Sequence, residues 1–121
     1  MVENYDLKVR TKQFALQMIR LYTSLSKTTE AQVIGKQVLR SGTSVGAQYR
    51  EAQRAKSDAD FINKVEGSLQ ELDETAYWLE LLQESGMFST EKLTPLLKEA
   101  DELTAIFVTI VKKVKNKRTI R

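Results

Sequence analysis

Residues 40–52 read RSGTSVGAQYREA, with two glycines, two serines, a threonine and two alanines among thirteen residues. Such a composition is typical of a phosphate-binding loop, a flexible linker or a closely packed helix. A P-loop requires the pattern G-x-x-x-x-G-K-[ST] after a strand. Here Gly42 and Gly46 are four residues apart and no lysine follows them, and the G-x-G-x-x-G pattern of dinucleotide sites is absent as well. We therefore do not interpret this stretch as a nucleotide-binding loop.

The stretch instead lies inside a helical pattern that extends from about residue 30 to residue 56. Small or apolar residues recur there in steps of three and four, with Gln48 as the off-type member: Ala31, Ile34, Val38, Ser41, Val45, Gln48, Ala52 and Ala55. Gly42 and Gly46 share a face, and each costs roughly 1 kcal/mol of helix propensity relative to alanine. We expect close contact with another backbone or a bulky ring to offset this cost. The candidate rings are Tyr77, Trp78 and Phe107.

Three further segments show the same spacing. The segment at residues 7–26 carries Leu7, Thr11, Phe14, Met18, Leu21 and Leu25. The segment at residues 58–84 carries Ile62, Val65, Leu69, Leu72, Ala76 and Leu79. The segment at residues 89–115 carries Leu93, Leu96, Ala100, Leu103, Phe107, Ile110 and Val114.

Capping residues separate these segments. Thr28 or Thr29 and Ser57 are expected N-caps, and Gly86 is the expected glycine after a helix C-terminus. Residues 116–121 form a basic tail that we expect to fray. Four amphipathic helices with short loops predict an all-α, antiparallel, up-down-up-down four-helix bundle, formed as one domain by residues 1–121.

The composition of this 121-residue chain excludes several classes of enzyme. The chain has no cysteine and no histidine, so it lacks the residues of thiolate metal sites and the commonest general base. Di-iron sites in bundles need Glu-x-x-His pairs, and we expect no enzymatic activity, no cofactor and no metal. The sequence shows neither a signal peptide nor an apolar run of the roughly 18–20 residues that cross a bilayer. We expect a cytoplasmic protein without a membrane partner.

Charge is unevenly distributed along the chain, although the net charge is only +3. Residues 1–57 carry ten Lys/Arg and four Asp/Glu, which gives +6. Residues 58–111 carry three and twelve, which gives −9, and residues 112–121 carry six and none, which gives +6. This asymmetry indicates either a basic surface for nucleic acid or complementary faces that meet in an oligomer.

Three motifs carry a resemblance to a known family. They are R-S-G-T-S-V-G-A-x-Y-R-E-A, then S-x-A-D-F, then D-E-T-x-Y-W-L-E-L, and they span about residues 39–82. The chain resembles the four-helix-bundle family of 23S rRNA intervening-sequence proteins, or S23-like proteins. One departure is Gln48, where the family usually has Asn.

This resemblance implies a left-handed bundle that assembles as a homopentamer. It also implies a bacterial protein whose gene lies within an rRNA intervening sequence or elsewhere in the genome. A distant relative is the accessory protein of diversity-generating retroelements, which works beside a reverse transcriptase and binds nucleic acid. For most members of the family no enzymatic activity is established.

Two functions remain open at this point. The first is a homo-oligomer that binds the RNA or DNA backbone, because Lys and Arg side chains attract phosphates in a salt-dependent way. Its candidate residues are Arg40, Arg50, Arg54, Lys56, Lys112, Lys113, Lys115, Lys117, Arg118 and Arg121. No aromatic–basic interleaving typical of base-reading surfaces is present, so base-specific recognition is not expected.

The second function is a protein-interaction scaffold, in which the assembled ring docks a reverse transcriptase or another protein. Its candidate helix-packing or subunit-interface residues are Ser41, Gly42, Val45, Gly46, Tyr49, Tyr77 and Trp78. We favour packing over base stacking as the role of Tyr49. Glu51 and Glu74 are expected ion-pair partners of Arg40 or Arg50.

Overall fold

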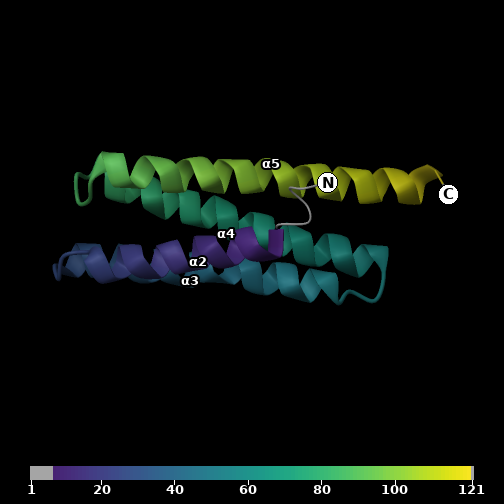
Figure 1. The fold of residues 1–121 in the computed structure, drawn as a ribbon, viewed down its shortest axis with the longest axis horizontal. Helices are drawn as coiled ribbons and strands as arrows, with labels where there is room; N and C mark the ends of the chain where they lie inside the picture. The colour runs from purple at the N-terminus through teal and green to yellow at the C-terminus, as the bar shows by residue number, and fades with distance from the viewer. Residues whose placement is uncertain (1–6, 121) are drawn as a thin grey trace.

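The computed structural model describes residues 7–120, and the side chains of residues 7–117. This part of the chain forms four helices: α2 (Leu7–Ser24), α3 (Thr29–Gln53), α4 (Asp58–Glu84) and α5 (Thr90–Ile120). Short connections at alternate ends make the chain run up-down-up-down (Figure 1). No strand occurs within residues 7–120. The predicted all-α four-helix bundle is confirmed, whereas its left-handedness stays a prediction.

The caps lie where the sequence predicted them. The Thr28 hydroxyl oxygen accepts a hydrogen bond from the Ala31 N–H at 3.3 Å. The Ser57 hydroxyl oxygen accepts one from the Asp60 N–H at 3.0 Å. Each bond satisfies a donor that the first turn of a helix leaves unpaired. Gly86 has a φ of 76°, the left-handed conformation that favours glycine after a helix.

Two helix ends differ from the prediction by more than two residues, and the others agree within two residues. α3 ends at Gln53 rather than near Lys56, because the N–H groups of Arg54 and Ala55 bond to carbonyls three residues back and tighten the last turn. α5 continues to Ile120, although we expected fraying from residue 116. The lysines of this segment oppose the partial negative charge of the helix C-terminus. No helix within the described residues, α5 included, is long and apolar enough to cross a bilayer.

One hydrophobic core runs between the helices. Along α2 and its following turn, the buried residues are those that the spacing predicted: Leu7, Thr11, Phe14, Met18, Leu21 and Leu25. α3 packs extensively against both α2 and α4, and α4 packs against α5, whereas α2 and α5 make few contacts. At that open side Arg10 forms ion pairs with Glu99 at 2.7 Å and Glu102 at 3.1 Å. The core therefore depends most on the two interfaces of α3.

The α4 side of the α3–α4 interface carries polar residues that the sequence pattern missed. Ser68 and Thr75 are fully buried, whereas the predicted members Leu69 and Ala76 are only partly buried. The Ser68 hydroxyl donates to the Val45 carbonyl oxygen of α3 at 3.0 Å. A small hydroxyl side chain allows close approach and satisfies its own polar group there.

The α3 side of this region also differs from the predicted pattern. Tyr49 is buried in place of Gln48, because its ring packs on Phe107 of α5 with centroids 5.5 Å apart. Burial raises the pKa of the Tyr49 phenol. Gln48 instead lies over Gly67 of α4, where the absence of a side chain leaves room for its amide. This packing supports the structural interpretation of Tyr49 over base stacking.

Candidate nucleic-acid interface

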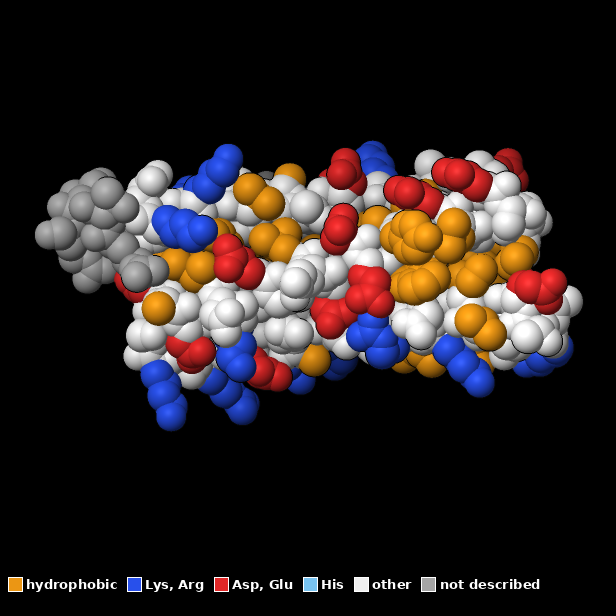
Figure 2. Space-filling view, turned by 180° about the vertical axis from the view of Figure 1, so that it is seen from behind, with side chains coloured by type: hydrophobic (Ala, Val, Ile, Leu, Met, Phe, Trp, Pro, Cys, Tyr) orange, Lys and Arg blue, Asp and Glu red, His pale blue; other side chains and the backbone are white. Residues whose placement is uncertain are grey.

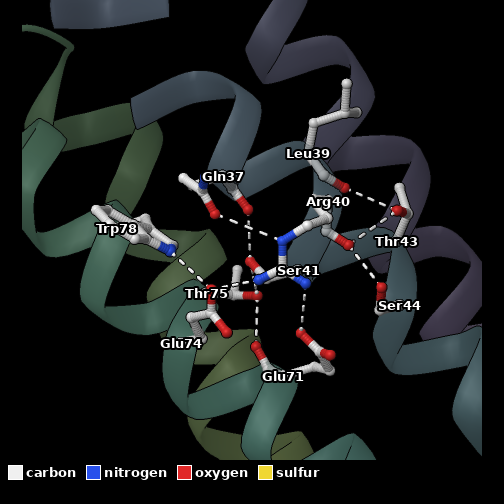
Figure 3. Close-up of polar contacts among 10 residues, drawn as sticks. All are labelled: Gln37, Leu39, Arg40, Ser41, Thr43, Ser44, Glu71, Glu74, Thr75 and Trp78. Carbon is white, nitrogen blue, oxygen red and sulfur yellow. Dashed lines mark hydrogen bonds and ion pairs between the residues drawn. The ribbon is translucent and has the colours of Figure 1, made fainter. Parts of the chain in front are cut away.

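Arg40 lies at the surface between α3 and α4, where two carboxylates neutralise it (Figure 3). Its guanidinium forms ion pairs with Glu74 and, at 3.4 Å, with Glu71. The Trp78 indole N–H donates to the same Glu74 carboxylate at 3.3 Å. The hydrogen bond from Arg40, and then that from Trp78, lowers the pKa of Glu74, and the bond to Glu74 raises the pKa of Arg40. These pairings argue against Arg40 as a phosphate contact.

Beneath these ion pairs, two buried hydroxyls join α3 to α4 (Figure 3). Thr75 Oγ1 lies 2.8 Å from Ser41 Oγ and 2.7 Å from the Glu71 carbonyl oxygen. The Ser41 hydroxyl donates to the Gln37 carbonyl oxygen at 2.8 Å. Every hydroxyl proton thus has an acceptor, so Ser41 acts inside the bundle.

Gly42 and Gly46 face α2 rather than an aromatic ring. A Cβ atom on Gly42 would overlap the Met18 side chain, and one on Gly46 would lie 3.0 Å from Thr11 Oγ1. The expected close packing therefore occurs between α2 and α3 of the same chain. Val45, which lies between the two glycines in the sequence, is also fully buried within the bundle. The aromatic partners that we named from the sequence, Tyr77, Trp78 and Phe107, are wrong, because Met18 and Thr11 of α2 occupy this position.

Of the two neighbouring aromatics of α4, Tyr77 is exposed at the surface, and Trp78 is partly buried against the hydrophobic core. Their rings meet edge to face with centroids 5.1 Å apart, and Tyr77 remains 54% exposed. Tyr77 borders an open groove of about 630 Å³ along α4, whose lining includes Glu71, Glu74 and Glu80. Figure 2 shows apolar side chains among acidic ones near the end where α4 ends and α5 begins. No three acidic residues of the described part are grouped as a metal site would require.

The glutamates predicted as ion-pair partners divide between two outcomes. Glu74 pairs with Arg40, as expected. Glu51 pairs with Lys64 at 3.0 Å rather than with Arg50, and this hydrogen bond raises the pKa of Lys64. Arg50 is consequently left without a carboxylate partner among the described residues.

Most of the remaining predicted cations gather at one end of the bundle. The last turns of α3 and of α5 lie at the same end, because the two helices run in the same direction (Figure 1). The exposed cations there that form no ion pair among the described residues are Arg50, Arg54, Lys56, Lys112, Lys113 and Lys117. Lys115 pairs with Glu66 at 3.5 Å. The side chains of Arg118 and Arg121 lie outside the described residues.

The sequence pattern missed two cations of this end, Lys8 and Lys12. With Arg50 they line a groove of about 310 Å³ between α2 and α3. Both are exposed and form no ion pair with a described residue. Their i, i+4 spacing, which puts both on one face of α2, is the signal that could have identified them. We call the eight unpaired cations the basic end: Lys8, Lys12, Arg50, Arg54, Lys56, Lys112, Lys113 and Lys117.

Comparisons with known proteins agree on one family. A family model described as 23S rRNA-intervening sequence protein matches residues 3–109. A solved structure from Bacteroides thetaiotaomicron, described as a protein with unknown function from the S23 ribosomal protein family, is 40% identical, with a TM-score of 0.82. The match covers 87% of this chain and 97% of the other. Among proteins with curated descriptions, none matches the chain significantly.

Proposed function

The chain belongs to the family of 23S rRNA-intervening sequence proteins, and from this premise we propose that it binds the phosphate backbone of nucleic acid, RNA in particular. The binding surface is the basic end, and the site of action is the cytoplasm. The proposed role is non-enzymatic, and binding requires no metal, no cofactor and no group that transfers a proton. The family name associates these proteins with ribosomal RNA sequence, which favours RNA as the first probe.

The observation that carries the proposal is that none of these eight cations forms an ion pair with a carboxylate of the described residues. Arg40 and Lys64, on the neighbouring faces, are neutralised by glutamates. The cations of the basic end keep their charge exposed to solvent. Clustered Lys and Arg side chains release condensed counterions when they neutralise phosphates, so binding falls as salt rises.

The surface supports binding without sequence preference. Among the aromatic side chains near it, Tyr49 is buried against Phe107 and does not present its ring face to a base. Base-specific recognition of RNA uses exposed aromatic rings and hydrogen bonds to base edges. Backbone contacts position a protein on nucleic acid but carry no sequence information.

We further propose that the chain acts as a homo-oligomer, with the pentamer as the expected assembly. In such an assembly the basic end would recur in every subunit, and its electrostatic field would add. Light scattering measures the solution mass directly. A monomer at micromolar concentration would contradict this part of the proposal.

The binding proposal is tested with a fluorescent single-stranded RNA of mixed sequence, titrated at low and at moderate salt. We expect the affinity of the natural protein to fall steeply with salt. A triple variant, Lys112→Gln with Lys113→Gln and Lys117→Gln, should bind more weakly and with a shallower salt dependence. A matched variant removes three exposed lysines away from the basic end: Lys27→Gln, Lys36→Gln and Lys98→Gln. Equal losses in both variants, or an affinity that ignores salt, would reject the basic end as the binding surface.

A second function is favoured by the exposed ring of Tyr77 beside the acidic groove of α4. Exposed aromatic residues are enriched at protein–protein contacts. In that alternative the α4 face contacts a protein, such as a reverse transcriptase, and nucleic acid is not bound. Loss of partner binding in Tyr77→Ser, with no RNA binding by the natural protein, would favour this alternative.

A further inference from the structure

The groove between α2 and α3 gives the basic end a shaped site as well as a charged one. Lys8 and Lys12 line it from α2, and Arg50 lines it from α3. Between them the lining is made of small side chains: Thr11, Ala15, Thr43, Gly46 and Ala47. The cavity measures about 310 Å³, near the lower limit of the range typical of small-ligand pockets.

The shape of the groove follows from the close packing of the two helices. Gly46 lies against Thr11, so the backbones of α2 and α3 form the floor. The Thr11 and Thr43 hydroxyls donate to carbonyl oxygens of their own helices, at 2.8 and 2.7 Å. Their protons are thus occupied, and the recognition of an anion is left to the three cations.

We propose that this groove seats a phosphodiester segment of the nucleic-acid backbone, an inference that rests on the proposed function. The planar guanidinium of Arg50 can donate two parallel hydrogen bonds to one phosphate, and Lys8 and Lys12 supply charges opposite it. Arg54 follows Arg50 by four residues on the same face of α3. The sugar-phosphate backbone of the nucleic acid would leave the groove along that face of α3, past Arg54.

The lining of the groove selects for a phosphodiester rather than for a base. Among the described residues, the lining contains no aromatic side chain on which a base could stack and no carboxylate that would repel a phosphate. The small side chains leave space for the strand to approach both helices. Single-stranded and duplex RNA share this phosphate chemistry, and both are used as probes.

A steric variant tests the groove without changing its charge. Ala47 is exposed, so Ala47→Leu should fold normally and fill the groove. We expect the affinity for single-stranded RNA to fall about tenfold, which corresponds to about 1.4 kcal/mol. Ala105→Leu, at an exposed alanine of α5 outside the groove, is the matched control and should bind as the natural protein does. Circular dichroism and thermal unfolding check the fold of each variant.

A charge variant gives an independent measurement. Lys12→Gln with Arg50→Gln should lose more affinity than Lys112→Gln with Lys113→Gln, although both remove two positive charges from the basic end. The RNA form that shows the larger loss identifies the natural source of the phosphodiester. If the natural protein binds RNA but the groove variants match their controls, the groove is rejected and the proposed function stands. If the natural protein does not bind RNA, both proposals fail.

Discussion

α3 packs against its two neighbours in different ways. Toward α2 it presents glycines, and Gly42 and Gly46 lie directly against the side chains of Met18 and Thr11. Toward α4 it presents Ser41, whose hydroxyl meets that of Thr75. Both interfaces are close, but among the described residues a hydrogen bond between two fully buried side chains occurs only at the α4 interface, whereas the Tyr22–Gln32 bond of the α2 interface is partly buried.

The difference shows two ways to bring helices together in water. Removing the side chain gives close contact at roughly 1 kcal/mol of helix propensity per glycine, and the fit then depends on steric complementarity alone. A small hydroxyl side chain costs less helix propensity than glycine does. It also fixes how the two helices are aligned, because its hydrogen bond forms in one register only. We therefore expect the α2 interface to be sensitive to volume and the α4 interface to polarity.

The largest expected effect is at the α2 interface. Gly42→Leu places a side chain where Met18 already lies, and overpacking of this kind should lower the free energy of unfolding by about 2–3 kcal/mol. Urea unfolding followed by circular dichroism measures the change. In the double variant Gly42→Leu with Met18→Ala, the leucine should fill the space that Met18 leaves. The double variant should then be more stable than the sum of the single changes predicts.

Gly67→Ala is the matched control for this volume effect. Its new methyl group would meet only the end of the flexible Gln48 side chain, which can move aside. Together with the gain in helix propensity, this should leave stability unchanged or slightly raised. A loss as large as that of Gly42→Leu would contradict the view that the α2 interface is the volume-sensitive one.

The second effect is at the α4 interface. Thr75→Val keeps the shape of the side chain but removes the hydroxyl that meets Ser41, and we expect a loss of about 1 kcal/mol in the free energy of unfolding. Thr109→Val is the control, because the exposed Thr109 hydroxyl donates only within its own helix, to the Ala105 carbonyl oxygen at 2.9 Å. Its change should stay within about 0.5 kcal/mol. Similar losses in both variants would show that the contact between the helices adds nothing.

The sequence predicted the helices well because each carries its signal locally. The heptad spacing of α2 identified its buried residues, and Ser57 and Gly86 marked the ends of α4. The buried residues of α4 at the α3–α4 interface were harder to predict, because a pattern that ranks residues by apolarity selects Leu69 over Ser68. Ser68 is buried only because the Val45 carbonyl of another helix accepts its hydrogen bond, and local spacing does not contain that information.

The candidate interface was less predictable for the same reason. Whether a cation is available depends on which carboxylates the fold brings beside it. Arg40 and Arg50 look alike in the sequence, but Arg40 meets Glu71 and Glu74 across the α4 interface whereas Arg50 lies at the α2 interface. Lys8 and Lys12 become candidate phosphate contacts only because the antiparallel packing places the start of α2, where they lie, beside the end of α3 and Arg50.

The smallest expected effect concerns the ion pairs at the edge of the α4 interface. The hydrogen bond from Arg40 holds the pKa of Glu74 below the ordinary value of a glutamate. A carboxylate with a lowered pKa in the folded state contributes stability above its unfolded pKa, and this contribution is lost as the pH falls through the folded value. Because the pair is partly exposed, we expect it to contribute less than about 1 kcal/mol at neutral pH.

Glu74→Gln keeps the shape of the side chain and removes its charge, so it isolates this contribution. At neutral pH and low salt the variant should unfold at slightly lower urea than the natural protein, and the difference should shrink as the pH falls through the lowered pKa of Glu74. Glu80→Gln is the control, since Glu80 is exposed on the same helix and forms no ion pair with a described residue. A Glu74→Gln difference that persists undiminished in acid would have to come from packing, and the α4 interface would then depend on volume as the α2 interface does.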